Sequence, residues 1–92
     1  MATGQAIVKP EDLRRFAAEL KQFSEHLKSD GVRLRGQFQR VGETWRDQEH
    51  QRFAREFDQT LKVFNQFNRE AEQYVTFLMR KAQAAEEYLR QR

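Results

Sequence analysis

Two long, regularly patterned segments meet at residues 41–48, which read VGETWRDQ. Gly42 is placed as the C′ glycine that ends the first segment, because glycine readily adopts the backbone angles that follow a helix. Asp47, or Thr44 with Asp47 three residues later, is suited to cap a helix that begins after it. The stretch therefore predicts a turn over residues 42–47 between two helices.

The segment before the turn has an apolar residue at every seventh position: Leu13, Leu20, Leu27, Leu34 and Val41. Phe16 and Phe23 lie three residues after the first two leucines, which predicts that they pack in the same seam. Further along, this companion position shifts by one residue, to Gly31, Phe38 and Trp45. We expect one helix over residues 10–41, with Gly31 permitting a close neighbour, and a flexible arm over residues 1–9.

The segment after the turn contains no proline or glycine and is predicted to be helical over residues 48–90. Its main apolar seam repeats at spacings of four and three: Phe53, Phe57, Leu61, Phe64, Asn68, Ala71, Val75, Leu78, Ala82, Ala85 and Leu89. A second stripe lies beside the seam: Val63, Phe67, Tyr74, Phe77, Ala84 and Tyr88. Asn68 is either a buried amide that sets register or partner choice, or a solvated residue at the rim.

The short turn makes the two helices antiparallel, so the predicted fold class is all-α, a helical hairpin over residues 10–92. Two helices cannot cover both apolar stripes, because so wide an apolar band needs more than one neighbour. We therefore expect the hairpin to pair with a second one into a four-helix bundle dimer. The predicted interface consists of large apolar residues on both helices: Phe16, Phe23, Phe38, Trp45, Phe53, Phe57, Phe64, Phe67, Tyr74, Phe77 and Leu78.

The composition excludes several classes of protein. Of 92 residues, 38% are hydrophobic and 34% charged, which indicates one small domain without a membrane span. Eight phenylalanines and one tryptophan argue against a disordered tail, and so short a chain leaves little room for the cleft of an enzyme. The chain has no cysteine, and neither His26 nor His50 has a second ligand at metal-binding spacing. We expect no catalytic residue, metal or cofactor.

The net charge of +3 comes from 17 basic and 14 acidic residues whose signs are interleaved. This pattern is typical of solvated helix faces, whereas a nucleic-acid-binding surface gathers its basic residues on one face. A local excess of basic residues lies near the turn: Arg33, Arg35, Arg40 and Arg46. A small nucleic-acid-binding bundle that uses these arginines is the alternative function, although nucleic acid is not the partner that we favour.

Several features together resemble the WXG family of helical-hairpin proteins, the ESAT-like substrates of bacterial type VII (ESX) secretion. The chain opens with a Val-x-Pro-Glu-x-Leu pattern over residues 8–13, has a heptad-spaced first helix and carries Trp45 near mid-chain. The turn motif of the family is Trp-x-Gly, and here it consists of Trp45, Arg46 and Asp47. Aspartate suits the third position because it caps helices and tolerates left-handed backbone angles.

The resemblance implies a non-enzymatic protein that acts through protein–protein interaction as a type VII secretion substrate or partner. It implies synthesis in the cytoplasm and secretion without a cleaved signal peptide, and residues 1–9 show no such signal. The implied partners are a second copy (homodimer), a paralogous hairpin (heterodimer) and the secretion ATPase. A further alternative is an adaptor for a larger secreted toxin or coat protein.

Tyr88 is the candidate tail signal, by resemblance to the Tyr-x-x-x-Asp/Glu sequence of the family. The residue four positions after it is Arg92, where the family has an acid. Transport would then depend on a partner that carries the complete signal, or on a related system that reads another feature.

Overall fold

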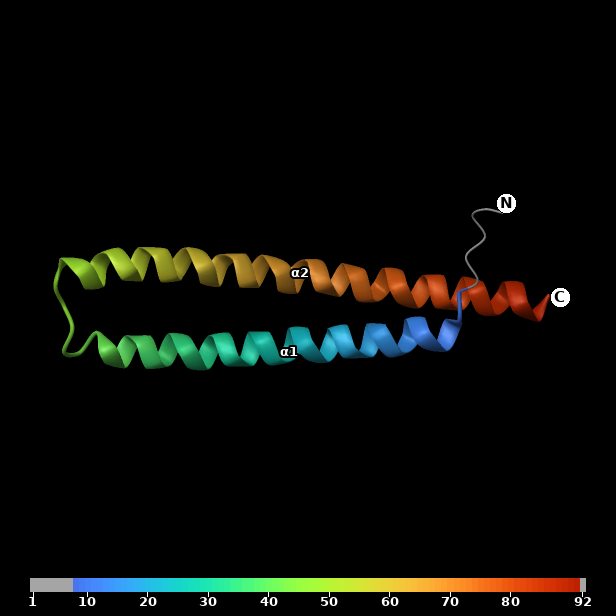
Figure 1. The fold of residues 1–92 in the computed structure, drawn as a ribbon, viewed down its shortest axis with the longest axis horizontal. Coiled ribbons are helices and arrows are strands. Elements are labelled where there is room, and N and C mark those ends of the chain that lie inside the picture. Colours follow the sequence, from blue (N-terminus) through green and yellow to red (C-terminus); the bar gives the residue numbers. More distant parts are fainter. Residues whose placement is uncertain (1–7, 92) are drawn as a thin grey trace.

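A computed structural model describes residues 8–91 of the chain as two long helices joined by one turn (Figure 1). Helix α1 spans Pro10–Val41 and helix α2 spans Gln48–Arg90. The helices lie side by side and antiparallel, and no strand occurs among the described residues. The predicted all-α hairpin is therefore confirmed. Of the arm expected over residues 1–9, all but the last two residues lie outside the described part.

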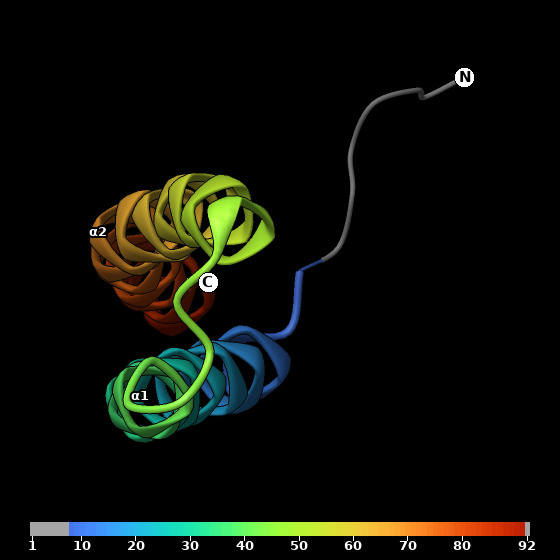
Figure 2. The ribbon, with the colours of Figure 1, turned by 90° about the vertical axis from the view of Figure 1, so that its left-hand side faces the viewer.

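The hairpin is long and thin, measuring 67 × 25 × 14 Å. Seen from the turn, α1 and α2 cross at a shallow angle (Figure 2). Because α2 has 43 residues and α1 has 32, the C-terminal end of α2 extends past the start of α1 (Figure 1). Two helices alone enclose few side chains. The buried apolar residues of the hairpin core are three alanines and one leucine: Ala17, Leu61, Ala71 and Ala82.

The start of α1 follows from Pro10, which occupies the first turn. Proline is favoured there because its ring already holds the helical φ and no N–H is lost. Glu11 and Asp12 add negative charge at the positive end of the helix dipole. Lys9, the N-cap residue, is extended and contributes no side-chain cap, but its carbonyl accepts hydrogen bonds from the N–H groups of Asp12 and Leu13.

The end of α1 differs in detail from the expected C′ glycine. Gly42 is the C-cap residue with φ −66° and ψ −11°, which are right-handed angles open to any residue. Its value lies in the missing side chain, because a Cβ atom here would sit 3.3 Å from the Gln39 carbonyl oxygen and 3.4 Å from Nε2 of His50. Glycine therefore makes room for the His50 ring against the end of α1.

The start of α2 is capped by Asp47, as expected for one of the two proposed caps. Its carboxylate accepts a hydrogen bond of 2.9 Å from the backbone N–H of His50, three residues on. Asp47 is extended, with φ −87° and ψ −173°, so the suggested left-handed conformation is not used. Capping, and not backbone freedom, is thus the role of aspartate where the family motif has glycine.

Replacing Asp47 with alanine should lower the free energy of unfolding by about 1 kcal/mol, because the N–H of His50 loses its acceptor. Asp47→Asn keeps a capping oxygen and is expected to lose only a small part of that stability. Urea denaturation followed by circular dichroism measures both variants. Equal losses for alanine and asparagine would show that the cap contributes nothing.

The α1 seam against α2 differs from the predicted one. Phe16 and Phe23 are 58% and 56% exposed, whereas Ala17 is buried and Ser24 half-buried. Each heptad leucine of α1 therefore shares the seam with the residue four positions after it. In the first half of the helix, the predicted partner was the residue three positions after it. The small side chains of Ala17 and Ser24 carry little hydrophobic signal, so periodicity alone favours the neighbouring phenylalanines for the seam.

Gly31 continues this line of small residues, seven positions after Ser24. The expected close neighbour is absent within the hairpin, because a Cβ atom added at Gly31 would meet nothing within 4 Å. The glycine therefore leaves open space on the hairpin instead of permitting contact with α2.

Asn68 lies inside the α2 seam and is only 8% exposed, which answers the question left open by its periodicity. Its Oδ1 accepts a hydrogen bond of 2.8 Å from the Ser24 hydroxyl, across the two helices. A buried amide oxygen needs such a partner, and a register shift between α1 and α2 would remove it. The pair therefore favours one alignment of the hairpin.

Ser24→Ala should lower the free energy of unfolding by about 1–2 kcal/mol, because Oδ1 of Asn68 would be buried without a donor. Adding Asn68→Leu should recover most of this loss, since removal of both polar partners leaves no unmade hydrogen bond. A double-mutant cycle in urea measures the coupling. Independent, additive effects of the two substitutions would contradict the proposed role of this hydrogen bond.

Candidate protein-interaction site

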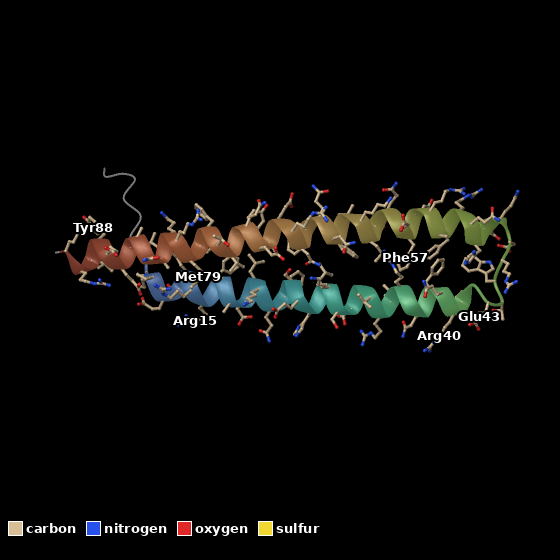
Figure 3. The ribbon with its side chains drawn as sticks, turned by 180° about the vertical axis from the view of Figure 1, so that it is seen from behind. Arg15, Arg40, Glu43, Phe57, Met79 and Tyr88 are labelled. Carbon is tan, nitrogen blue, oxygen red and sulfur yellow. The ribbon has the colours of Figure 1, made fainter. Side chains whose placement is uncertain are left out.

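The turn end of the hairpin holds a cluster of aromatic rings from both helices, which we call the turn cluster: Phe38, Trp45, His50, Phe53 and Phe57. Phe38 of α1 lies 5.1 Å from both Phe57 and His50, measured between ring centroids, and is stacked on the histidine. Figure 3 shows Phe57 directed from α2 toward α1, while Arg40 points away. The rings pack against one another within a single hairpin, and Phe53 keeps 44% of its surface exposed.

Each residue of the turn motif has a distinct structural role. The indole of Trp45 meets the His50 ring edge-on at 5.0 Å, and its backbone N–H donates to the carbonyl of Val41. Nε of Arg46 donates to the carbonyl of Gly42 at 3.1 Å. With the Asp47 cap, these contacts connect the end of α1 to the start of α2.

A set of aromatic residues, exposed except for the half-buried Phe67, lies on one side of the seam, away from the turn. We call it the aromatic face: Phe16, Phe23, Phe67, Tyr74 and Phe77. The rings of Phe23 and Phe67 meet edge-on across the two helices, 5.9 Å apart, which places both on the same side. Phe16 and Tyr74 lie seven residues from these two, so they continue the face along α1 and α2. Phe77, one turn after Tyr74, is 62% exposed.

The other side of the seam is hollowed, and we call it the groove face. One hollow of about 370 Å³ lies around Ser24 and Ala71, and a second of about 280 Å³ lies around Gly31 and Leu61. Both hollows are lined by Lys28 and Asn68, so they follow one another along the hairpin. Small side chains at three of these places, serine, alanine and glycine, leave the space open.

Charges on the groove face differ between the two helices. On α1 a basic residue recurs every seven positions: Arg14, Lys21, Lys28 and Arg35. On α2 the corresponding flank carries Glu72 and Glu86, and the guanidinium of Arg14 binds the carboxylate of Glu86. Within residues 8–91 no ion pair joins Lys21, Lys28 or Arg35 to a carboxylate. Three basic side chains therefore line the hollows with their charges open to a partner.

The structure divides the predicted interface residues among different places. Four of them belong to the turn cluster of a single hairpin: Phe38, Trp45, Phe53 and Phe57. Phe64 lines the second hollow, and Leu78 is half-buried in the seam. The other five form the aromatic face. The part of each residue in a dimer stays a prediction.

Sequence reasoning missed the groove face and the place of His50 in the turn cluster. The groove face had a signal, namely basic residues at every seventh position beside Ser24 and Gly31, but the stronger aromatic pattern hid it. His50 had none, because its contacts depend on how closely α1 and α2 approach at the turn.

Other kinds of site find little support in the described residues. No group of three or more histidines and carboxylates is placed there to hold a metal ion. Neither described helix contains a stretch long and apolar enough to cross a membrane. Arg33 and Arg35 are about 200° apart around α1, so the basic residues near the turn do not share one face. Arg33 is also paired with Asp30 at 3.0 Å.

The helical hairpin and the tryptophan at its turn agree with one sequence family. The profile of the WXG100 family, described as proteins of 100 residues with WXG, matches residues 5–89. The chain belongs to the WXG100 family. WXG100 proteins are small, non-enzymatic helical proteins associated with type VII secretion. The WXG100 match thus agrees with the motif that surrounds Trp45.

Comparison with curated proteins gives no match, and comparison with solved structures gives none either. The WXG100 assignment therefore rests on the family profile and on the hairpin fold.

Proposed function

We propose that this WXG100 protein acts without catalysis, by pairing its aromatic face with a second helical hairpin, and that it is a substrate or partner of type VII secretion. The exposure of the aromatic face is the observation that carries the proposal. Phe16, Phe23, Tyr74 and Phe77 each leave about half or more of their surface open to solvent. Contiguous apolar patches of this kind mark protein–protein interfaces.

The partner is proposed to be a second copy or a paralogous hairpin, giving a four-helix bundle. Aromatic side chains dominate interface energetics, since each buries about 150–250 Å² when fully covered. Covering the aromatic face would complete the core that two helices leave open. It would leave the turn cluster of each hairpin intact.

Tyr88 extends from the last turns of α2, beyond the start of α1, and is 67% exposed (Figure 3). It is thus accessible to a secretion machinery as part of the candidate tail signal. Because Arg92 stands where the family has an acid, we propose that a paired hairpin carries the complete signal.

The first experiment measures association. Light scattering coupled to size-exclusion chromatography compares the wild-type chain with Tyr74→Glu/Phe77→Glu, alone and with a paralogous hairpin. The variant is expected to remain monomeric in both cases, because two carboxylates would be buried in an apolar interface. Gln59→Glu/Gln66→Glu adds the same charge at exposed sites of α2, more than two turns before Phe77, and should pair like the wild type. Unchanged pairing of the aromatic-face variant would refute the proposal.

The second experiment measures export from a bacterium with a type VII system. The chain should reach the medium with its partner hairpin present, and remain in the cells when the secretion ATPase is deleted. Export independent of that ATPase would refute the secretion role while leaving the pairing untouched.

A further inference from the structure

The second hollow of the groove face has a polar end and an apolar end. The hydrogen bond between Ser24 and Asn68 shows how the antiparallel helices are aligned. Three or four residues nearer the turn, Lys28 on α1 therefore lies across from Asn65 on α2, and both line the hollow. Apart from Arg35, the wall that continues toward the turn is apolar: Gly31, Val32, Leu61 and Phe64. The hollow thus suits a ligand with one polar end and an apolar body.

The polar end contains a hydrogen-bond donor that the hairpin leaves unused. Asn68 is only 8% exposed, and its Oδ1 accepts the hydrogen bond from Ser24. Its amide nitrogen donates to no atom of residues 8–91. Because Asn68 lines both hollows, the small exposed part of its side chain opens into them. A donor in so enclosed a place needs an acceptor, and the groove face is where one can reach it.

The charges around this donor favour an anionic acceptor. Lys28 lines both hollows, as Asn68 does, and Arg35 lies seven residues further along α1 in the second. Within residues 8–91 neither cation is paired with a carboxylate, and no carboxylate lines the second hollow. The first hollow contains Glu25 and Glu72, which repel an anion. A negatively charged acceptor is therefore directed to the Lys28 end of the second hollow.

The apolar end has room for the body of such a ligand. The second hollow has a volume of about 280 Å³, against roughly 150 Å³ for a cavity that holds benzene. From Lys28 to Arg35 it follows α1 for about 10.5 Å, so the space is elongated and suits an acyl chain. Phe64 and Val32 are 37% and 71% exposed, which leaves apolar surface for that chain to cover.

We propose that the groove face binds a medium-chain fatty acid. The carboxylate accepts hydrogen bonds from the amide of Asn68 and the ammonium group of Lys28, and the acyl chain lies over Gly31 and Leu61 toward Arg35. Hydrogen bonds to a charged acceptor are stronger than neutral ones, and burial of the chain adds hydrophobic stabilisation. The site belongs to a single hairpin and lies on the other side of the seam from the aromatic face. It is therefore independent of the pairing proposed above.

The test titrates the full-length chain with sodium decanoate, below the concentration at which decanoate forms micelles. Two-dimensional nitrogen–proton NMR follows the amides. We expect saturable shifts of the Asn68 side-chain amide and of the backbone amides of Gly31 and Leu61. Decanol has the same chain without the charge, and acetate has the charge without the chain. Each should bind at least about tenfold more weakly, because each lacks one of the two contributions.

Two variants test the two ends of the site separately. Lys28→Gln removes the cation and should raise the Kd for decanoate about tenfold. Gly31→Leu fills the apolar end and should abolish the saturable shifts, and its Cβ atom meets nothing within 4 Å, so the helix should be retained. The matched controls are Lys81→Gln, which lies outside both hollows, and Gly36→Leu, where a Cβ atom also meets nothing within 4 Å. Both should bind decanoate like the wild type, and circular dichroism confirms that every variant is helical.

Several results would overturn the inference. Equal affinity for decanol would show that the carboxylate makes no contribution, and equal affinity for acetate would reduce the site to an anion site. Unchanged binding by Gly31→Leu, with shifts around Phe23 and Phe67, would place the chain on the aromatic face. A wild-type chain without saturable shifts in decanoate would show that the groove face holds no fatty acid. Light scattering measures the pairing of hairpins separately, so the proposed function is tested by its own result.

Discussion

Replacing Leu61 with alanine should lower the free energy of unfolding by about 2–3 kcal/mol and the melting temperature by on the order of 10–20 °C. Leu61 is 5% exposed and is the one large apolar side chain among the buried residues of α2. Truncation removes its burial and enlarges the adjacent hollow. A hairpin of this size has a total stability of only about 5–14 kcal/mol, so the loss is a substantial share.

Val63→Ala is the matched control for this prediction. Val63 lies two residues from Leu61 on the same helix but is 62% exposed, and its truncation should change stability by less than about 0.5 kcal/mol. Thermal unfolding by circular dichroism, at one low protein concentration, keeps association from adding stability. Similar losses for both variants would mean that Val63 is covered, as in a stable assembly.

Trp45→Ala should lower the free energy of unfolding by about 2 kcal/mol. Truncating a fully buried tryptophan to alanine lowers the free energy of unfolding by roughly 3–5 kcal/mol. Trp45 is only half-buried, so its truncation should cost less. Its contacts with His50 and Phe53 would disappear, and the stacked pair of Phe38 and His50 would become exposed to solvent.

Trp45→Phe retains a ring at this place and should recover more than half of the loss. The measurement is again thermal unfolding at low protein concentration, with Tyr88→Ala as an exposed aromatic control. An unchanged melting temperature for Trp45→Ala would show that the turn cluster does not stabilise the hairpin. It would leave the tryptophan a role in partner binding alone.

The positions of the helix ends follow from local chemistry, which is why sequence analysis can predict them. Pro10 acts at the start of α1 through its own ring. Asp47 acts before α2 through its carboxylate and a neighbouring backbone N–H group. The role of Gly42 was predictable only in part. Its place at the end of α1 is a local matter, whereas its proximity to the His50 ring, 3.4 Å from where a Cβ atom would lie, depends on the approach of the other helix.

The α1 seam shows where periodicity fails. Phe16 and Ala17 are neighbours, and either is compatible with the heptad pattern of the leucines. Hydrophobicity favours phenylalanine for the core, yet the close approach of α1 and α2 leaves room for alanine and turns the ring outward. The same applies to Asn68, whose burial depends on a serine that lies 44 residues away in the sequence.

For the candidate site, the residue types were predictable and their grouping was not. Exposed aromatic residues in excess of what two helices can bury were expected from the two stripes of α2. Their division into a turn cluster inside one hairpin and an aromatic face outside it depends on which side of each helix faces the seam. The groove face arises from side chains that are small, and missing volume has almost no signature in a sequence.

Helix propensity, capping and apolar periodicity are local properties, so they suffice to predict two antiparallel helices with more apolar surface than they can cover. Which apolar residues belong to the hairpin and which face outward depends on tertiary packing. That choice depends on the rotation and separation of α1 and α2. These are set by small residues at the contact and by one buried hydrogen bond between Ser24 and Asn68.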